Sequence, residues 1–223
     1  MLGSPASSKY PPAAIQFQLR GDLARTRELA EAVIELSTEH GMAQDLVWGR
    51  TYRGWALARQ GKVEQGIGEM RASLAAHDAM GSRIARPHFL ALLSQALGRA
   101  GRVDEAKAAL AEAWASAQST GEHCYDAEIC RLRGELAQMQ DAAAEAENCF
   151  REAMTISMRQ SARSLELRAV MSLSRLSLAR SKRAEGRSML AETYGRFTEG
   201  FDTADLQEAK ALLEELQGLE HED

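Results

Sequence analysis

Hydrophobic residues recur at spacings of three and four positions through almost the whole chain. Over residues 82–121 this spacing predicts two successive helices, separated at Gly101 and ended at Gly121. Each glycine follows the last periodic residue, where glycine takes the left-handed conformation without strain. The stretch therefore predicts a hairpin of two amphipathic helices. Their apolar positions are Phe89, Leu93, Ala96, Leu97 and Ala100 in the first helix, and Val103, Ala106, Leu110, Ala113, Trp114 and Ala117 in the second.

The same hairpin recurs every 40 residues along the chain. Two series of helix-ending residues alternate, and each has a spacing of 40: Gly21, Gly61, Gly101, Asp141 and Ser181, and Gly41, Gly81, Gly121 and Ser161. The pattern predicts helices near residues 12–20, 22–40, 43–60, 62–80, 83–100, 102–120, 122–139, 141–160, 162–181 and 183–197. Five copies without an insertion predict an all-α helical-repeat protein.

Two packing positions keep the same register in every copy. The first helix of each pair, helix A, has a small residue at Ala14, Gly54, Ser94, Gly134 and Ser174. The second, helix B, has one at Thr26, Gly66, Ala106, Ala146 and Gly186, followed four residues later by Ala30, Met70, Leu110, Phe150 and Leu190. Because small residues let helices approach closely, these positions predict the contact between the two helices of a hairpin.

The pattern resembles the tetratricopeptide repeat (TPR), with its small residue in helix A and the run Ala146, Phe150 and Ala153 in helix B. The repeat here has 40 residues instead of 34. Several runs resemble the long-repeat C-terminal region of bacterial multidomain regulators, among them RGWALARQGKVEQGI, AENCFREAM and YGRFTEGFDTADLQEAKALLEEL. The resemblance implies a right-handed superhelical solenoid of about five hairpins. In those regulators it follows a P-loop ATPase module, with a nucleotide-cyclase or DNA-binding domain in front; the maltose-regulon activators are similar.

The two ends of the repeat region differ. Residues 199–202 are expected to break the 40-residue period, and Asp202 or Thr203 to begin a last helix over residues 204–217 that covers the final hairpin. Pro11 and Pro12 shorten the first helix, so its hairpin is expected to leave an apolar face uncovered, for earlier domains of a longer polypeptide or a second copy of the chain. We expect a disordered leader over residues 1–11, one repeat domain over residues 12–218 and a disordered tail over residues 219–223.

Composition excludes several classes of protein. The net charge of −5 provides no basic field for nucleic acid. Three cysteines in helical patterns argue against a disulfide framework and favour a cytoplasmic protein. No apolar run reaches the roughly 18 residues that span a bilayer, so no membrane partner is expected.

No sequence motif indicates catalysis or a cofactor. Gly61 and Lys62 are followed by Val63, so the phosphate-binding loop is absent, and the zinc-protease, CxxC and GxSxG patterns are absent too. Glu145, Glu147, Glu214 and Glu215 fall on faces expected to be solvated. We therefore expect no enzyme activity in this chain.

Two other clusters have a structural and a functional interpretation. His123, Cys124, Cys130 and Cys149 could be metal ligands, but the structural zinc sites of proteins have tighter spacings, so ordinary helix positions are favoured and no metal is expected. The basic residues of the fifth hairpin could bind an anion, but a solvated face paired with Glu166 and Glu185 is favoured. These residues are Arg159, Arg163, Arg168, Arg175, Arg180, Lys182, Arg183 and Arg187.

In a TPR solenoid the A helices line the inner, concave surface. The resemblance therefore predicts a partner-binding groove, whose candidate residues are Trp48, Thr51, Trp55, Arg59, His88, Gln95, Arg99, Arg131, Glu135, Arg168 and Arg175. Trp48 and Trp55 have a second interpretation, packing between adjacent repeats. The carboxylate clamp found in one TPR subclass is not expected, because none of the corresponding positions is Asn.

The first functional hypothesis is a non-enzymatic regulatory scaffold that binds a protein segment or a neighbouring domain in this groove, as part of a signal-transduction protein. The second is a sensor for a small-molecule effector, with a pocket around Trp48, Trp55 and Arg59.

Overall fold

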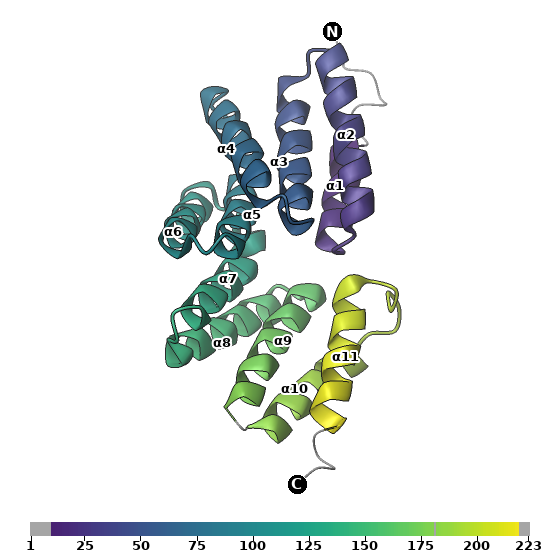
Figure 1. The fold of residues 1–223 in the computed structure, drawn as a ribbon, viewed down its shortest axis with the longest axis vertical. Coiled ribbons are helices and arrows are strands. Elements are labelled where there is room, and N and C mark those ends of the chain that lie inside the picture. The colour runs from purple at the N-terminus through teal and green to yellow at the C-terminus, as the bar shows by residue number, and fades with distance from the viewer. Residues whose placement is uncertain (1–9, 181, 219–223) are drawn as a thin grey trace. The chain divides into compact units, whose positions relative to one another are not determined.

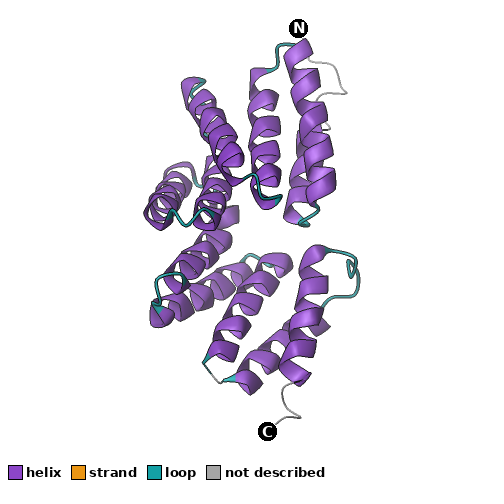
Figure 2. Ribbon diagram, in the orientation of Figure 1, coloured by secondary structure: helices purple, strands orange, loops and turns teal. Residues whose placement is uncertain are grey.

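The computed structural model describes residues 10–180 and 182–218, and within them every regular element is a helix (Figures 1 and 2). The chain forms two compact units, Met1–Glu122 and His123–Asp223. The expected disordered segments fall mostly on residues 1–9 and 219–223, outside the described residues. Residues 10 and 11, expected in the leader, already belong to the first helix. None of the helices in the described ranges is long and apolar enough to span a membrane.

Unit 1 is a stack of three hairpins, in which each odd-numbered helix is a helix A and pairs with the helix that follows it (Figure 1). The helices are α1 (Tyr10–Leu19), α2 (Leu23–Glu39), α3 (Ala43–Arg59), α4 (Val63–Ala79), α5 (Arg86–Arg99) and α6 (Val103–Thr120).

Unit 2 contains two hairpins and a last helix. Its elements are the short 3₁₀ helix η2 (His123–Tyr125), α7 (Asp126–Gln138), α8 (Ala143–Arg159), α9 (Arg163–Ala179), α10 (Arg183–Gly195) and α11 (Ala204–Gly218). Helices α7 and α8 form one pair, and α9 and α10 form the other. The all-α fold of stacked hairpins with a 40-residue repeat, expected from the sequence, is confirmed.

The residues that end the helices adopt the predicted left-handed conformation. The backbone φ angle is +72° at Gly21, +90° at Gly61 and +72° at Gly101. The series continues in residues other than glycine, with +58° at Asp141 and +55° at Ser161. Ser181, the next position, lies outside the described residues.

The small residues lie where the helices of a hairpin meet. A Cβ atom on Gly66 would clash with the carbonyl oxygen of Gly54 and lie 2.8 Å from the backbone nitrogen of Ala58. Where helix A has serine, its hydroxyl bridges the pair: Ser94 donates to the carbonyl of Ala106 at 2.9 Å, and Ser174 does so to Gly186 at 2.9 Å.

The last helix keeps the register that the preceding loop was expected to break. Leu216 stands 40 residues after Leu176, and both are buried. The small position of helix A is occupied by Glu214 in α11, and its exposed carboxylate lies 3.9 Å from the ammonium group of Lys210. Helix α11 is therefore a sixth helix A, which covers the last hairpin with one face and has charged residues on the side where a helix B would pack.

Helix α5 begins three residues later than predicted, since a residue before proline disfavours the helical conformation and Pro87 stands in its first turn. Ala85, in a left-handed conformation with φ of +60°, precedes the helix. Its N–H group donates to both carboxylate oxygens of Glu122 at 3.0 Å, and His77 Nε2 lies 3.0 Å from the carbonyl oxygen of Ile84. These contacts hold the loop before α5 in place.

Candidate functional site

The A helices pack side by side within each unit. In unit 1, α3 contacts α1 and α5; in unit 2, α9 contacts α7 and α11. The predicted groove residues of unit 2 lie on α7 and α9, and the 40-residue register adds Asp205 and Glu208 of α11. We use the name A-helix face of unit 2 for Glu128, Arg131, Glu135, Arg168, Met171, Arg175, Asp205 and Glu208.

Arg131 is the buried centre of this face. Its guanidinium donates to Glu128 at 2.8 and 2.9 Å, to Glu135, and to the Ser172 hydroxyl at 3.5 Å. Burial opposes the charged form of Arg131, but the carboxylates of Glu128 and Glu135 outweigh it and raise the pKa of the guanidinium above its ordinary range. Arg131 therefore stays charged and orients both acids.

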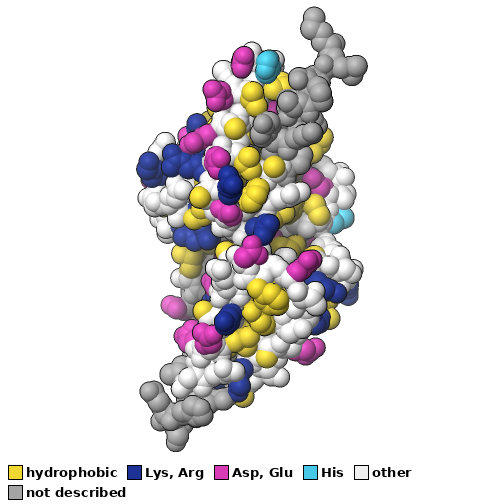
Figure 3. All heavy atoms as spheres, turned by 90° about the vertical axis from the view of Figure 1, so that its right-hand side faces the viewer, with side chains coloured by type: hydrophobic (Ala, Val, Ile, Leu, Met, Phe, Trp, Pro, Cys, Tyr) yellow, Lys and Arg dark blue, Asp and Glu magenta, His cyan; other side chains and the backbone are white. Residues whose placement is uncertain are grey.

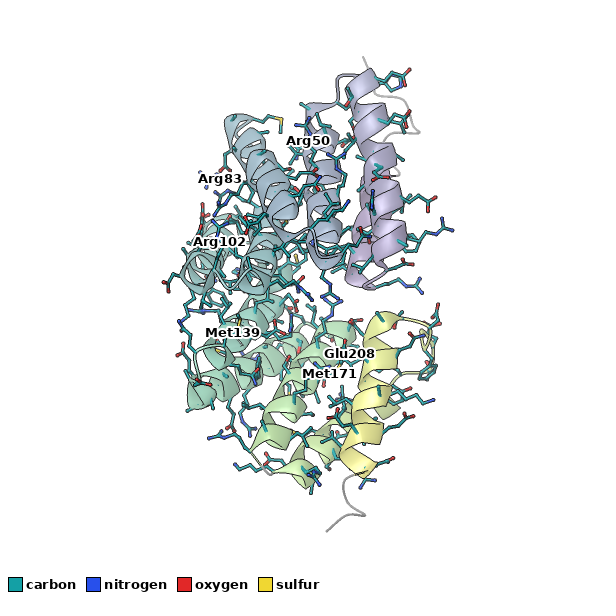
Figure 4. The ribbon with its side chains drawn as sticks, viewed as in Figure 1. Arg50, Arg83, Arg102, Met139, Met171 and Glu208 are labelled. Atoms are coloured by element: carbon teal, nitrogen blue, oxygen red, sulfur yellow. The ribbon has the colours of Figure 1, made fainter. Side chains whose placement is uncertain are left out.

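The arginines of α9 pair with the acids of α11. Arg168 Nε donates to Asp205 at 2.7 Å and its guanidinium lies 3.9 Å from Glu128, so the interaction runs from α7 across α9 to α11. Arg175 donates to Glu208 at 2.6 Å, and both side chains are more than two-fifths exposed. Figure 4 shows Glu208 beside Met171, which is buried under the charged layer. The A-helix face of unit 2 is thus a layer of oriented, ion-paired charges over an apolar core.

In unit 1 the predicted groove residues form an aromatic cluster. The ring of Trp48 lies 5.1 Å from Phe89 and 6.1 Å from Tyr52, and Tyr52 lies 6.1 Å from His88. Trp48 is half-buried, whereas His88 is buried. Trp48 thus packs across α3 and α5 and also keeps some exposure.

Trp55 is covered by its own neighbours. Its indole N–H donates to Gln95 at 2.8 Å, the Arg59 guanidinium lies 5.7 Å from its ring centre, and its exposed fraction is 3%. Gln95 stands 40 residues after Trp55, so this bond joins corresponding positions of two repeats. Arg99, at the position corresponding to Arg59, is exposed.

Thr51 differs from its expected place in the groove. Its hydroxyl donates to the Val47 carbonyl at 2.9 Å, shares a 2.8 Å hydrogen bond with the Ser73 hydroxyl of α4, and is fully buried. Thr51 therefore joins the two helices of its hairpin, as does the bond from Ser73 to the Val47 carbonyl at 2.7 Å. The same correction applies to His88, whose burial removes it from the accessible surface.

The basic residues of the fifth hairpin are engaged by acids, but the partners differ from those expected. Arg180 pairs with Glu147 at 2.8 Å. Glu166 pairs with Arg196 at 2.6 Å, and Glu185 with Arg151 at 3.3 Å. The carboxylates come from neighbouring helices, which a one-dimensional pattern could not identify.

The residues considered as metal ligands have other contacts. His123 Nδ1 lies 2.9 Å from Asp126 Oδ2 at the start of α7. Burial raises the pKa of the Cys130 thiol to about 12 and also raises that of Cys149, so both thiols stay protonated at neutral pH. Within the described part of the chain no three His, Cys, Asp or Glu side chains gather as metal ligands would.

Asp205 and Glu208 were missing from the predicted set. Glu208 stands 40 residues after Arg168, itself a predicted groove residue, so continuing the register past the last loop would have included it. The expectation that this loop breaks the period kept α11 out of the groove.

No protein-family model matches the chain, and no curated protein matches it either. Solved structures of similar fold do exist. BtubC (BKLC) from P. vanneervenii is 16% identical, with a TM-score of 0.64 over 90% of this chain and 91% of that one. A putative kinesin light chain of Podospora anserina with nearly identical TPR-like repeats is 17% identical, with a TM-score of 0.56 over 97% and 99%. A variant form of that kinesin light chain has a TM-score of 0.57 over 84% and 92%. At these identities the likeness concerns the fold alone: the chain has the fold of TPR-like helical-repeat proteins.

Proposed function

We propose that this chain is a non-enzymatic scaffold that binds a segment of another protein, and that the A-helix face of unit 2 is a principal contact surface. Stacked helical repeats bind partners over extended surfaces built from corresponding positions of successive repeats. One observation carries the proposal: the A helices of unit 2 hold partly exposed charged groups in fixed orientations, of which Arg175 and Glu208 are the most accessible pair.

Oriented charges suit recognition of a polypeptide. Their side chains are already ordered by ion pairs, so binding orders little more of the protein. Complementary charges on a partner then determine its register and exclude other partners. Arginine is also enriched at protein interfaces because its planar guanidinium forms several hydrogen bonds at once.

The test is selection of binding peptides from a library of short random sequences on the immobilised chain. We expect selected peptides to bind Arg175→Glu about tenfold more weakly, because the reversed charge repels Glu208 and removes the cation. Lys210→Glu is the matched control: it makes the same charge reversal on the other side of α11 and should leave affinity unchanged. Failure to enrich any peptide, or equal affinity for wild type and Arg175→Glu, contradicts the proposal.

In unit 1, Trp48, Arg59, Gln95 and Arg99 are the predicted groove residues that keep exposure, and they extend the proposal to that unit as a separate contact surface. The competing hypothesis, a small-molecule sensor, requires a pocket around Trp55. Gln95 and Arg59 already cover this ring. We therefore expect no change in tryptophan fluorescence when the chain is titrated with sugars or nucleotides, while selected peptides still bind.

A regulatory role beside an ATPase or cyclase module rests on the sequence resemblance alone. The reading frame upstream of Met1 tests it, since an ATPase module encoded in frame supports the role and an unrelated gene after a stop codon contradicts it. Homodimerisation through α1 and α2 is a separate proposal, which a monomeric mass in gel filtration at high concentration would contradict.

A further inference from the structure

The loop over residues 196–203, between α10 and α11, is longer than the three-residue turns that join most helices, such as residues 60–62. Contacts at both ends hold it. The Arg196 guanidinium donates to Glu166 at 2.6 Å and to the Thr193 hydroxyl at 3.2 Å. At the other end, the N–H and hydroxyl groups of Thr203 both donate to the Gly200 carbonyl, at 2.9 and 2.7 Å. The loop is therefore an ordered part of unit 2.

This loop places Phe201 against Tyr194, the penultimate residue of α10. The ring centres are 5.8 Å apart and the ring planes meet at 57°. Tyr194 packs against the core formed with Leu206, Leu212 and Leu216, whereas Phe201 is 47% exposed. One ring of this pair, which we call the aromatic corner, is thus anchored and the other is open to solvent.

Acidic residues surround the aromatic corner in the sequence. Glu199 and Asp202 lie in the same loop as Phe201, and all three are exposed. Arg196, the basic residue of the loop, is engaged by Glu166. The right-hand side of Figure 1, where this loop lies, faces the viewer in Figure 3, which shows hydrophobic side chains gathered on its lower half with acidic ones beside them.

An aromatic ring attracts a cation to its face, and nearby carboxylates strengthen that attraction. We propose that the aromatic corner binds an arginine or lysine side chain of a protein partner. The loop is already ordered, so binding costs little conformational entropy. This site is separate from the A-helix face of unit 2, and it stands whether or not that face binds a peptide.

The test compares three capped peptides that differ only at two positions, which hold arginine, leucine or glutamate. Each is titrated into the labelled full chain while the NMR signals of the Gly200 and Phe201 amides are followed. We expect the arginine peptide to shift these signals and to bind about two- to fivefold more tightly than the leucine peptide, the ratio typical of an exposed cation–π contact. The glutamate peptide should leave the signals unchanged.

Phe201→Leu keeps an apolar side chain but removes the ring, so it should abolish the preference for arginine over leucine. Glu199→Gln should weaken arginine binding and reduce its sensitivity to salt. Met158→Leu, a change at another exposed hydrophobic residue of unit 2, is the matched control and should bind like wild type. Equal binding of the leucine and arginine peptides to wild type, absence of any shift, or an arginine preference that survives in Phe201→Leu would each overturn the proposal.

Discussion

At the residue scale, one left-handed residue ends most helices of the chain, and in two of these turns it carries a side chain. Asp141 and Ser161 have φ values of +58° and +55° where the earlier repeats have glycine. A residue with a Cβ atom in this conformation is strained by about 1–2 kcal/mol. The sequence predicted where these turns lie, since Asp141 and Ser161 stand in register with the glycines.

Ser161→Gly should therefore stabilise unit 2. Relief of the strain exceeds the extra chain entropy of glycine by about 0.5 kcal/mol, which corresponds to a rise of about 1–2 °C in the unfolding midpoint. Thermal unfolding followed by circular dichroism measures the shift. Gly101→Ala, the reverse change at a corresponding turn, should lower the midpoint. A lower midpoint for Ser161→Gly would show that its side chain makes a stabilising contact.

Two glycines of α4 separate packing from helix propensity. Gly66→Ala should destabilise the chain by about 1–3 kcal/mol, because its Cβ atom would meet the backbone of α3. Gly68→Ala should stabilise it by about 1 kcal/mol, because that position is exposed and no atom lies within 4 Å of the added Cβ. Urea unfolding of both variants gives the two free energies. Equal effects would contradict the close approach at Gly66.

At the scale of elements, charged pairs join the B helices of neighbouring hairpins. Arg71 of α4 donates to Glu105 of α6, and Arg102 bonds Glu105 at 2.6 Å and reaches Glu64 at 3.2 Å. Hydrogen bonds from Arg102 and Arg71 lower the pKa of Glu105 to about 2. These pairs link α4 with α6 across the surface of unit 1.

The Glu105 pKa leads to a prediction about acid unfolding. Because the pKa is lower in the folded chain than the ordinary value of 4.5, this carboxylate stabilises the fold above about pH 4.5, and the contribution is lost as the pH falls towards 2. NMR titration of the side chain should give a midpoint near 2, and Glu105→Gln should remove its part of the pH dependence in this window. Concentrated salt should raise the midpoint, since the group is exposed. A midpoint near 4.5 at low salt would contradict the ion pairs.

The sequence predicted the number of helices and most of their boundaries, because the 3.6-residue period and the turn residues recur in every copy. It missed the start of α5, where a left-handed Ala85 and a contact from the distant Glu122 replace the first turn. It also misjudged α11, because only packing reveals that Leu216 takes the place of Leu176. Both misses depend on residues far apart in the chain.

At the scale of the whole molecule, the chain consists of two units built from the same hairpin with different chemistry on their A helices. The register correctly grouped the candidate residues by repeat, but it could not separate exposed from buried ones. Thr51 and His88 are enclosed by neighbours, whereas Arg175 reaches solvent beside Glu208. Burial depends on the size of facing side chains, which the period alone does not specify.

The double exchange Arg175→Glu with Glu208→Arg tests the central claim most directly, with peptides selected on the wild-type chain. The exchanged pair keeps its attraction, so the unfolding midpoint should stay unchanged, while the pattern of charge on the A-helix face of unit 2 is reversed. We predict that the selected peptides bind the double variant about tenfold or more weakly than wild type. Binding equal to that of wild type, by a variant with an unchanged midpoint, would contradict the account.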